Sequence, residues 1–110
     1  MLTKEEVLLL LQQLPEQLKE AETGYYQALS RLEDTKLALH AKECELFSHG
    51  LITGKNEQAR DAEIWQHTHE LRRMLAKTKM TVDQYRVDYD YAKNKLENTQ
   101  LIAQLLLQLD

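Results

Sequence analysis

The sequence has few residues of the kinds that interrupt helices or build large compact cores. Its 110 residues include three glycines, one proline and one cysteine, and aromatic side chains make up only 6%. With so few helix breakers and 29% charged residues, the chain favours long helices over a compact mixed fold. A hydrophobic fraction of 43% is ordinary for a folded protein and argues against disorder.

The single cysteine, Cys44, excludes a disulfide within the chain. Together with the lack of a recognisable signal peptide, it predicts a reducing, cytoplasmic setting. The N-terminal apolar run from Val7 to Leu11 is far shorter than the roughly 20 residues that span a bilayer. We therefore expect no membrane association.

Positive charge is also scarce, since the net charge is −4 and the first 50 residues hold five basic against nine acidic side chains. An acidic chain is a poor electrostatic partner for nucleic acid, whose phosphates require clustered cations. One basic cluster lies in the second half, at Arg72, Arg73, Lys77 and Lys79. Because Glu70 and Asp83 flank it, we interpret the cluster as a solvated face, with a weak anion contact as the alternative.

Apolar residues at heptad spacing are abundant in both halves of the chain. Such spacing marks helices that bury one narrow stripe against another helix. The two stripes predict a hairpin seam that contains Leu11, Leu18, Tyr25, Leu32, Leu39, Leu71, Leu75, Val82, Tyr85, Tyr89 and Leu96. The fold class that follows is all-α, a long antiparallel two-helix coiled coil.

Local signals set the expected bounds of the two helices within a single domain, residues 1–110. Thr3 and Glu6 have the spacing of a capping box, so the first helix is expected over about 3–49. Gly50 suits a left-handed helix end, and Asn56 suits the cap of the next helix. The loop is therefore expected at about 50–56 and the second helix at about 57–108.

Pro15 leaves two structures open for the start of the chain. A proline inside a helix removes one donor and clashes with the preceding turn. The apolar phase continues through it from Leu11 to Leu18, which predicts a kinked but continuous helix. The alternative is a break, with residues 3–13 folding back as a separate helix.

The register of the hairpin follows from the position of its turn. If the turn centres near Thr53, Tyr25 lies beside Val82 and Leu18 beside Tyr89. Five seam positions are polar, namely Thr35, Lys42, Thr68, Thr78 and Thr99. Polar residues in such a seam weaken it while fixing its register; simple tolerance of these residues is the alternative.

The end of the hairpin that holds both termini has more leucine than one seam needs. We predict an oligomer interface there, formed by Leu8, Leu9, Leu10, Leu101, Ile102, Leu105, Leu106 and Leu109. Exposed apolar patches of this size usually mark an interface. The simplest assembly is a homodimer in which two hairpins form a four-helix bundle, unless residues 3–13 fold back over the patch.

The sequence offers no catalytic, cofactor-binding or metal-binding motif. His40, Cys44, Glu63 and His67 fall near one another under the expected register, but the heptad phase places Cys44 on the outer face of its helix. Metal ligands must converge to about 2.0–2.3 Å, so we expect no metal. Gly54-Lys55 lacks the other residues of a phosphate-binding loop. We therefore expect no enzymatic activity.

Apolar side chains gather around the expected turn. These residues are Phe47, Leu51, Ile52 and Trp65. They predict a small cluster over the tip of the hairpin, which either packs within the chain or docks a partner.

The turn itself resembles one family of proteins. Its sequence is Thr53-Gly54-Lys55-Asn56-Glu57-Gln58-Ala59-Arg60. It is similar to the turn Thr-Gly-Lys-Asn-x-x-x-Arg between the long helices of small phage- and prophage-encoded helical proteins. That resemblance implies a phage-like setting without implying an activity, and some of these proteins lie among phage DNA-metabolism genes.

Two functional hypotheses follow. The first is a non-enzymatic coiled-coil protein that associates with itself and with another, unidentified protein. The second is an accessory factor in phage-type DNA metabolism or recombination, which acts on nucleic acid or a nuclease through the basic cluster and Arg86.

Overall fold

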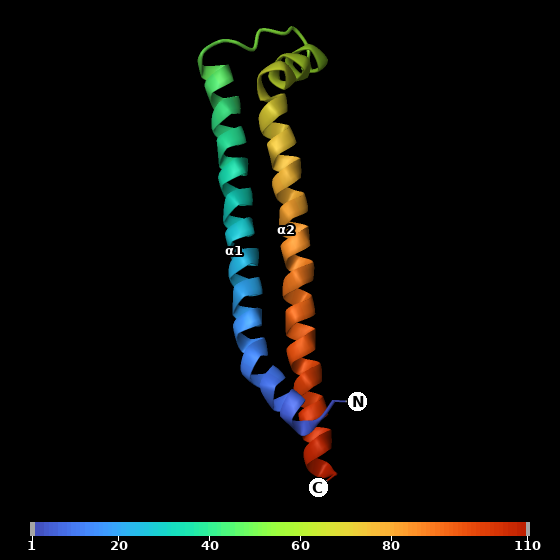
Figure 1. Ribbon diagram of the computed structural model, residues 1–110. Helices are drawn as coiled ribbons and strands as arrows, with labels where there is room; N and C mark the ends of the chain where they lie inside the picture. Colours follow the sequence, from blue (N-terminus) through green and yellow to red (C-terminus); the bar gives the residue numbers. More distant parts are fainter. Residues whose placement is uncertain (1, 110) are drawn as a thin grey trace. The chain divides into compact units, whose positions relative to one another are not determined.

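The computed structural model describes residues 2–109 and consists of two long helices (Figure 1). Helix α1 runs over Lys4–Ser48 and helix α2 over Glu57–Gln108. Residues 2–109 contain no strand. The all-α hairpin predicted from the heptad stripes is thereby confirmed.

The chain divides into two compact units, each built from parts of both helices. The open-end unit comprises the described residues of Met1–Gln27 and Asp83–Asp110, and the loop unit comprises Ala28–Val82. In each unit a stretch of α1 packs against an antiparallel stretch of α2 (Figure 1). Each unit therefore buries its own portion of the seam.

Both ends of α1 have the caps that the sequence predicts. The hydroxyl of Thr3 accepts a hydrogen bond of 3.1 Å from the backbone N–H of Glu6. At the other end Gly50 has a φ of +68°, a conformation that costs glycine little. The N–H of Leu51 donates to the carbonyl of Leu46 at 3.0 Å, and that of Gly50 to Phe47 at 3.2 Å. This pair of bonds forms a Schellman motif, which satisfies carbonyls that the helix leaves unpaired.

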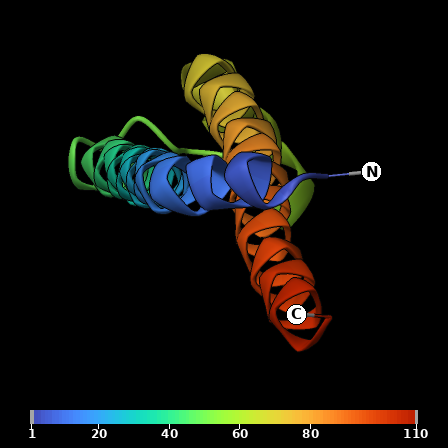
Figure 2. The same ribbon diagram turned by 60° about the horizontal axis from the view of Figure 1, so that its bottom comes forward.

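Helix α1 continues through Pro15, so the alternative of a separate helix over residues 3–13 is wrong. Within the open-end unit the first turns of α1, coloured blue, bend away from the direction of the turns that follow and lie against the last turns of α2 (Figure 1 and Figure 2). Proline is a common cause of such a kink because it removes a backbone hydrogen bond and crowds the preceding turn. Val7 and Leu14 are both buried, whereas Pro15 is exposed. The bend therefore keeps the apolar stripe of the first turns in the seam.

The loop is fastened to the start of α2 by polar contacts. Asn56 caps the helix by accepting a hydrogen bond of 2.8 Å from the N–H of Ala59. Thr53 donates its N–H to the Glu63 carboxylate at 2.7 Å, and the Arg60 guanidinium donates to the Gly54 carbonyl at 3.3 Å. A Cβ atom on Gly54 would lie 2.8 Å from the backbone nitrogen of Arg60. Only glycine fits at this point without a shift of the loop.

These contacts explain why the expected register is wrong. The ring centroid of Tyr25 lies 5.7 Å from that of Tyr89, rather than beside Val82 as predicted, a shift of seven residues along α2. In the loop unit Arg72 contacts Glu43 at 3.0 Å, which fits the same shifted register. Residues 53–54 lie against the first two turns of α2. Those turns therefore belong to the connection, and pairing with α1 begins later than a symmetric turn predicts.

The seam positions lie at the contact between the helices in both units. Val82 is buried, and most of the other predicted seam residues are half-buried, whereas Tyr85 is 36% exposed. The most deeply buried side chains are other members of the same stripes, among them Leu14 and Leu46 at 1% exposure and Thr68 at 0%. The heptad pattern therefore corresponds to the observed burial.

The buried threonines are satisfied within their own helices. The hydroxyls of Thr35, Thr68 and Thr99 each donate to the carbonyl four residues earlier, at 2.7 to 2.9 Å. A buried hydroxyl with a hydrogen-bond partner avoids most of the cost of leaving water. Because these hydroxyls donate within their own helix, their hydrogen bonds do not fix which residues of the other helix lie opposite them.

Two tyrosines of the open-end unit meet across the seam. Tyr25 and Tyr89 pack edge to face, a favoured geometry for aromatic pairs. The Arg86 guanidinium lies 6.0 Å from the centre of the Tyr25 ring. Hydrogen bonding to Tyr25 raises the pKa of Arg86 above its ordinary value, with nearby Asp83 and Asp90 adding to the effect. The shift reinforces the positive charge that an arginine carries in proteins in any case.

Replacement of Asn56 by alanine is expected to lower the free energy of unfolding by about 1 kcal/mol, because the N–H of Ala59 loses its partner. Urea unfolding followed by circular dichroism measures the change. Asn56→Asp is the control, since it keeps an acceptor at the cap and should lie within about 0.5 kcal/mol of the parent. Equal losses in both variants would contradict the role of the side chain as a cap.

Candidate interaction surface

An open apolar groove lies in the open-end unit between the first turns of α1 and the last turns of α2. It has a volume of about 240 Å³ and is lined by Lys4, Val7, Leu8, Leu11, Ala103, Leu106 and Leu107. All of these except Lys4 are apolar, and the groove opens to solvent. Because removing apolar surface from water is favourable, a partner that covers this groove with apolar side chains would be stabilised.

The predicted interface residues have two kinds of position. Leu10, Ile102 and Leu106 are half-buried. The remaining five are exposed to between 53% and 77%: Leu8, Leu9, Leu101, Leu105 and Leu109. The surplus of leucine noted in the sequence is therefore largely an exposed surface of the open-end unit. Leu2 and Leu107, at 37% and 73% exposure, add to it and were not predicted.

A second stripe on α2 was also missed from the sequence. Eight positions of the open-end unit alternate in steps of three and four residues: Gln84, Val87, Tyr91, Asn94, Asn98, Leu101, Leu105 and Gln108. We call this set the outer seam. All eight residues are exposed, Val87 and Tyr91 each to 66%. The spacing was a usable signal, but two asparagines at its centre interrupt the apolar pattern.

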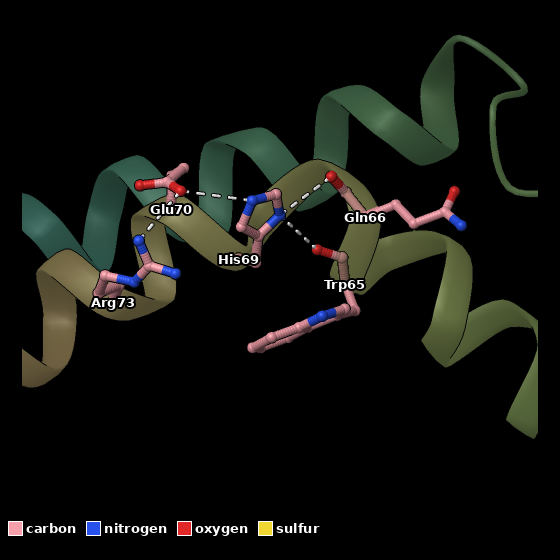
Figure 3. A network of polar contacts seen from close by, with 5 residues as sticks. All are labelled: Trp65, Gln66, His69, Glu70 and Arg73. Carbon is pink, nitrogen blue, oxygen red and sulfur yellow. Dashed lines mark hydrogen bonds and ion pairs between the residues drawn. The ribbon is translucent and has the colours of Figure 1, made fainter.

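In the loop unit a network of polar contacts runs along one exposed stretch of α2. The Nδ1 atom of His69 lies 3.3 Å and 3.2 Å from the carbonyl oxygens of Trp65 and Gln66, and its Nε2 atom lies 3.4 Å from the Glu70 carboxylate (Figure 3). Arg73 pairs with the same carboxylate at 3.3 Å. The rings of Trp65 and His69 lie 6.0 Å apart. All of these contacts join residues of α2 to one another.

The basic cluster, for which a weak anion contact was the alternative to a solvated face, is partly neutralised by the protein's own carboxylates. Arg72 contacts Glu43 across the two helices at 3.0 Å, and Arg73 contacts Glu70 along α2 at 3.3 Å. Lys77 and Lys79 are exposed. Exposed ion pairs are weak, but they lower the local positive potential that a phosphate would meet.

The residues expected to cap the turn are largely open to solvent. Phe47, Leu51 and Trp65 are exposed to 55%, 49% and 57%, and Ile52 is half-buried. The loop is held mainly by the polar contacts of Glu63, Arg60 and Asn56. The expected apolar cluster therefore contributes little buried surface.

Within residues 2–109, no group of three or more histidine, cysteine or carboxylate side chains is placed to hold a metal ion. Cys44 is exposed, and its Sγ atom lies 3.7 Å from Nε2 of His40 on the same helix. Glu63, which the expected register placed near His40 and Cys44, accepts a hydrogen bond from the N–H of Thr53.

Neither helix, over its described length, has an apolar stretch long enough to cross a membrane.

Comparison with protein families, with curated proteins and with solved structures finds no match to this chain.

Proposed function

We propose that this protein is a non-enzymatic coiled-coil protein that acts by binding protein, first of all a second copy of itself through the open-end unit. Its interface would comprise the leucines of both helices near the termini. A partner of another kind would then bind the assembled form.

The exposed leucines are the observation that supports this proposal most strongly. Leu8, Leu9, Leu101, Leu105 and Leu109 are each more than half exposed, and they belong to one unit of the fold. Scattered single leucines on a surface need no explanation, whereas five in one unit, with Leu8 among the residues that line an apolar groove, favour association. Burying a fully exposed leucine contributes roughly 1.5–3 kcal/mol, so burying the 53% to 77% of each that is exposed would contribute a corresponding part of this before the costs of association.

The nucleic-acid alternative has less support. Arg72, Arg73 and Arg86 each contact a carboxylate of the chain itself, and the chain carries a net charge of −4. The phage-like origin suggested by the loop stays a prediction.

Self-association is tested by replacing Leu9 and Leu105 together with glutamate. The parent protein is expected to have a mass of at least twice 12.9 kDa by light scattering after size exclusion. The double variant is expected to have the mass of one chain, because charges at these positions would be desolvated in the interface. Helicity should persist, since both side chains are already exposed in the single chain.

The matched control replaces Leu37 and Met74 with glutamate. These residues are similarly exposed, at 65% and 53%, but belong to the loop unit. This variant should keep the parent mass. A parent that is monomeric at tens of micromolar, or a Leu9/Leu105 variant that keeps its mass, would contradict the proposal.

A further inference from the structure

Helix α2 carries two heptad stripes on nearly opposite faces in the open-end unit. One, with Tyr89 and Leu96, faces α1 and is half-buried. The other is the outer seam defined above. At 100° per residue the centres of the two stripes lie roughly 150° apart. Because α1 occupies only one of them, α2 has a second coiled-coil face with no helix against it.

The outer seam reads the same in both directions about a centre at Leu96. From that centre outward each way it meets asparagine, two apolar residues and glutamine. Asn94 thus corresponds to Asn98, and the flanking pairs are Tyr91 with Leu101, Val87 with Leu105 and Gln84 with Gln108. In an antiparallel pair of identical helices the two-fold axis sets residue i against residue j and j against i. A palindromic order of residue types therefore places like against like at every contact.

We propose that the outer seam binds the outer seam of a second copy of this chain, as an antiparallel α2–α2 pair centred at Leu96. The inference rests on the proposed self-association and specifies the direction and the α2 part of its interface, to which Leu101 and Leu105 of the exposed leucines belong. Positions of the a and d type face each other in antiparallel coiled coils. Every such contact here joins like with like: asparagine with asparagine, apolar with apolar, glutamine with glutamine.

The two asparagines set the direction and register of this pair. Asn94 of one copy meets Asn98 of the other, and the symmetry repeats the contact. Slipping the helices by one heptad in either direction would place each asparagine against an apolar residue of the other copy, and a buried amide without a partner costs free energy. A parallel pair would require no palindrome, and it would place Tyr91 against a second Tyr91 and Val87 against a second Val87.

The charges beside the outer seam predict how the pair responds to salt. In the antiparallel register Lys95 lies near Lys95 of the second copy, and Glu97 near its own equivalent. Like charges at this distance repel weakly and are screened by salt. Association is therefore expected to strengthen as salt is raised from 50 mM to 500 mM, and a dimer that dissociates over this range would contradict this register.

Disulfide trapping tests the direction of the pair. The full chain is prepared with Cys44→Ser, which removes the exposed native thiol, and with a single cysteine at either Val87 or Leu105. In the antiparallel pair Val87 lies next to Leu105 of the other copy, and two Val87 positions lie about 27 Å apart along the helix. A disulfide needs Cα atoms within about 7 Å.

Under a glutathione redox buffer, an equimolar mixture of the two variants is expected to yield a covalent heterodimer in at least half of the chains. Either variant alone should yield less than one-tenth. Covalent homodimers of each variant alone would show a parallel pair and overturn the inference. A Leu37→Cys chain, mixed with either variant, is the control for random collision.

The same samples separate this inference from the proposed function. If the parent has the mass of a dimer but the mixed variants do not cross-link, the outer seam is not the interface, although self-association stands. If the parent is monomeric, both the inference and the proposed function fail.

Replacement of Asn94 and Asn98 with leucine tests their role in register. The Kd for association is expected to fall by at least about tenfold, since polar seam residues reduce stability. Cross-linking should at the same time lose its preference for the mixed pair. Tighter association with an unchanged preference would overturn the assignment of register to the asparagines.

Discussion

Replacement of Leu14 by alanine is expected to lower the free energy of unfolding by about 3 kcal/mol. Leu14 is 1% exposed and lies in the open-end unit, one residue before the kink at Pro15. Removing three carbon atoms from such a site loses their transfer free energy and leaves a cavity that the surrounding side chains fill only in part. In a protein whose total stability is about 5–15 kcal/mol, this is a large fraction.

Urea unfolding at fixed protein concentration measures the loss, since self-association makes the apparent stability depend on concentration. Leu37→Ala is the control, because Leu37 is 65% exposed, and it should change the free energy by less than about 0.5 kcal/mol. Losses of the same size in both variants would show that Leu14 is not packed against α2.

The effect of Gly24→Ala is expected to reverse in sign with the residue at position 85. A Cβ atom on Gly24 would lie 2.7 Å and 2.9 Å from two carbons of the Tyr85 ring, closer than van der Waals contact permits. The ring must leave its place over α1, at a cost of about 1–3 kcal/mol. Alanine regains about 1 kcal/mol through its better helix propensity. In the parent chain we expect a net loss of about 1 kcal/mol.

In a Tyr85→Ala background the clash is absent and only the propensity remains, so Gly24→Ala should stabilise the protein by about 1 kcal/mol. Unfolding of the parent, both single variants and the double variant closes a thermodynamic cycle, with an expected coupling of about 2 kcal/mol. If Gly24→Ala changed the free energy of unfolding with the same sign in both backgrounds, the position of the Tyr85 ring would not require glycine at position 24.

Much of the fold was predictable because its signals are local or periodic. The heptad spacing identifies the seam, and Thr3, Gly50 and Asn56 mark helix ends at which the structure has the expected caps. The apolar phase across Pro15 indicates continuity, and α1 is continuous. Each of these signals depends on residues no more than a few positions apart.

The register of the hairpin and the outer seam could not be predicted from these local signals. The register depends on how many turns of α2 the loop occupies, and this is decided by contacts such as that of Thr53 with Glu63. The outer seam has asparagine at its two central positions, so a search for apolar residues at heptad spacing does not detect it. Burial made it visible, because all eight of its positions are exposed while the opposite stripe packs on α1.

The sequence by itself therefore determined two long helices and the face of each that is buried. Helix propensity, capping and heptad phase act within one helix, and the scarcity of glycine and proline leaves few other structures open. Only the tertiary structure decided which residues of α1 meet which residues of α2, and which apolar residues are left over. Those outcomes depend on the path of the loop and on the mutual burial of two helices, which no single stretch of the chain contains.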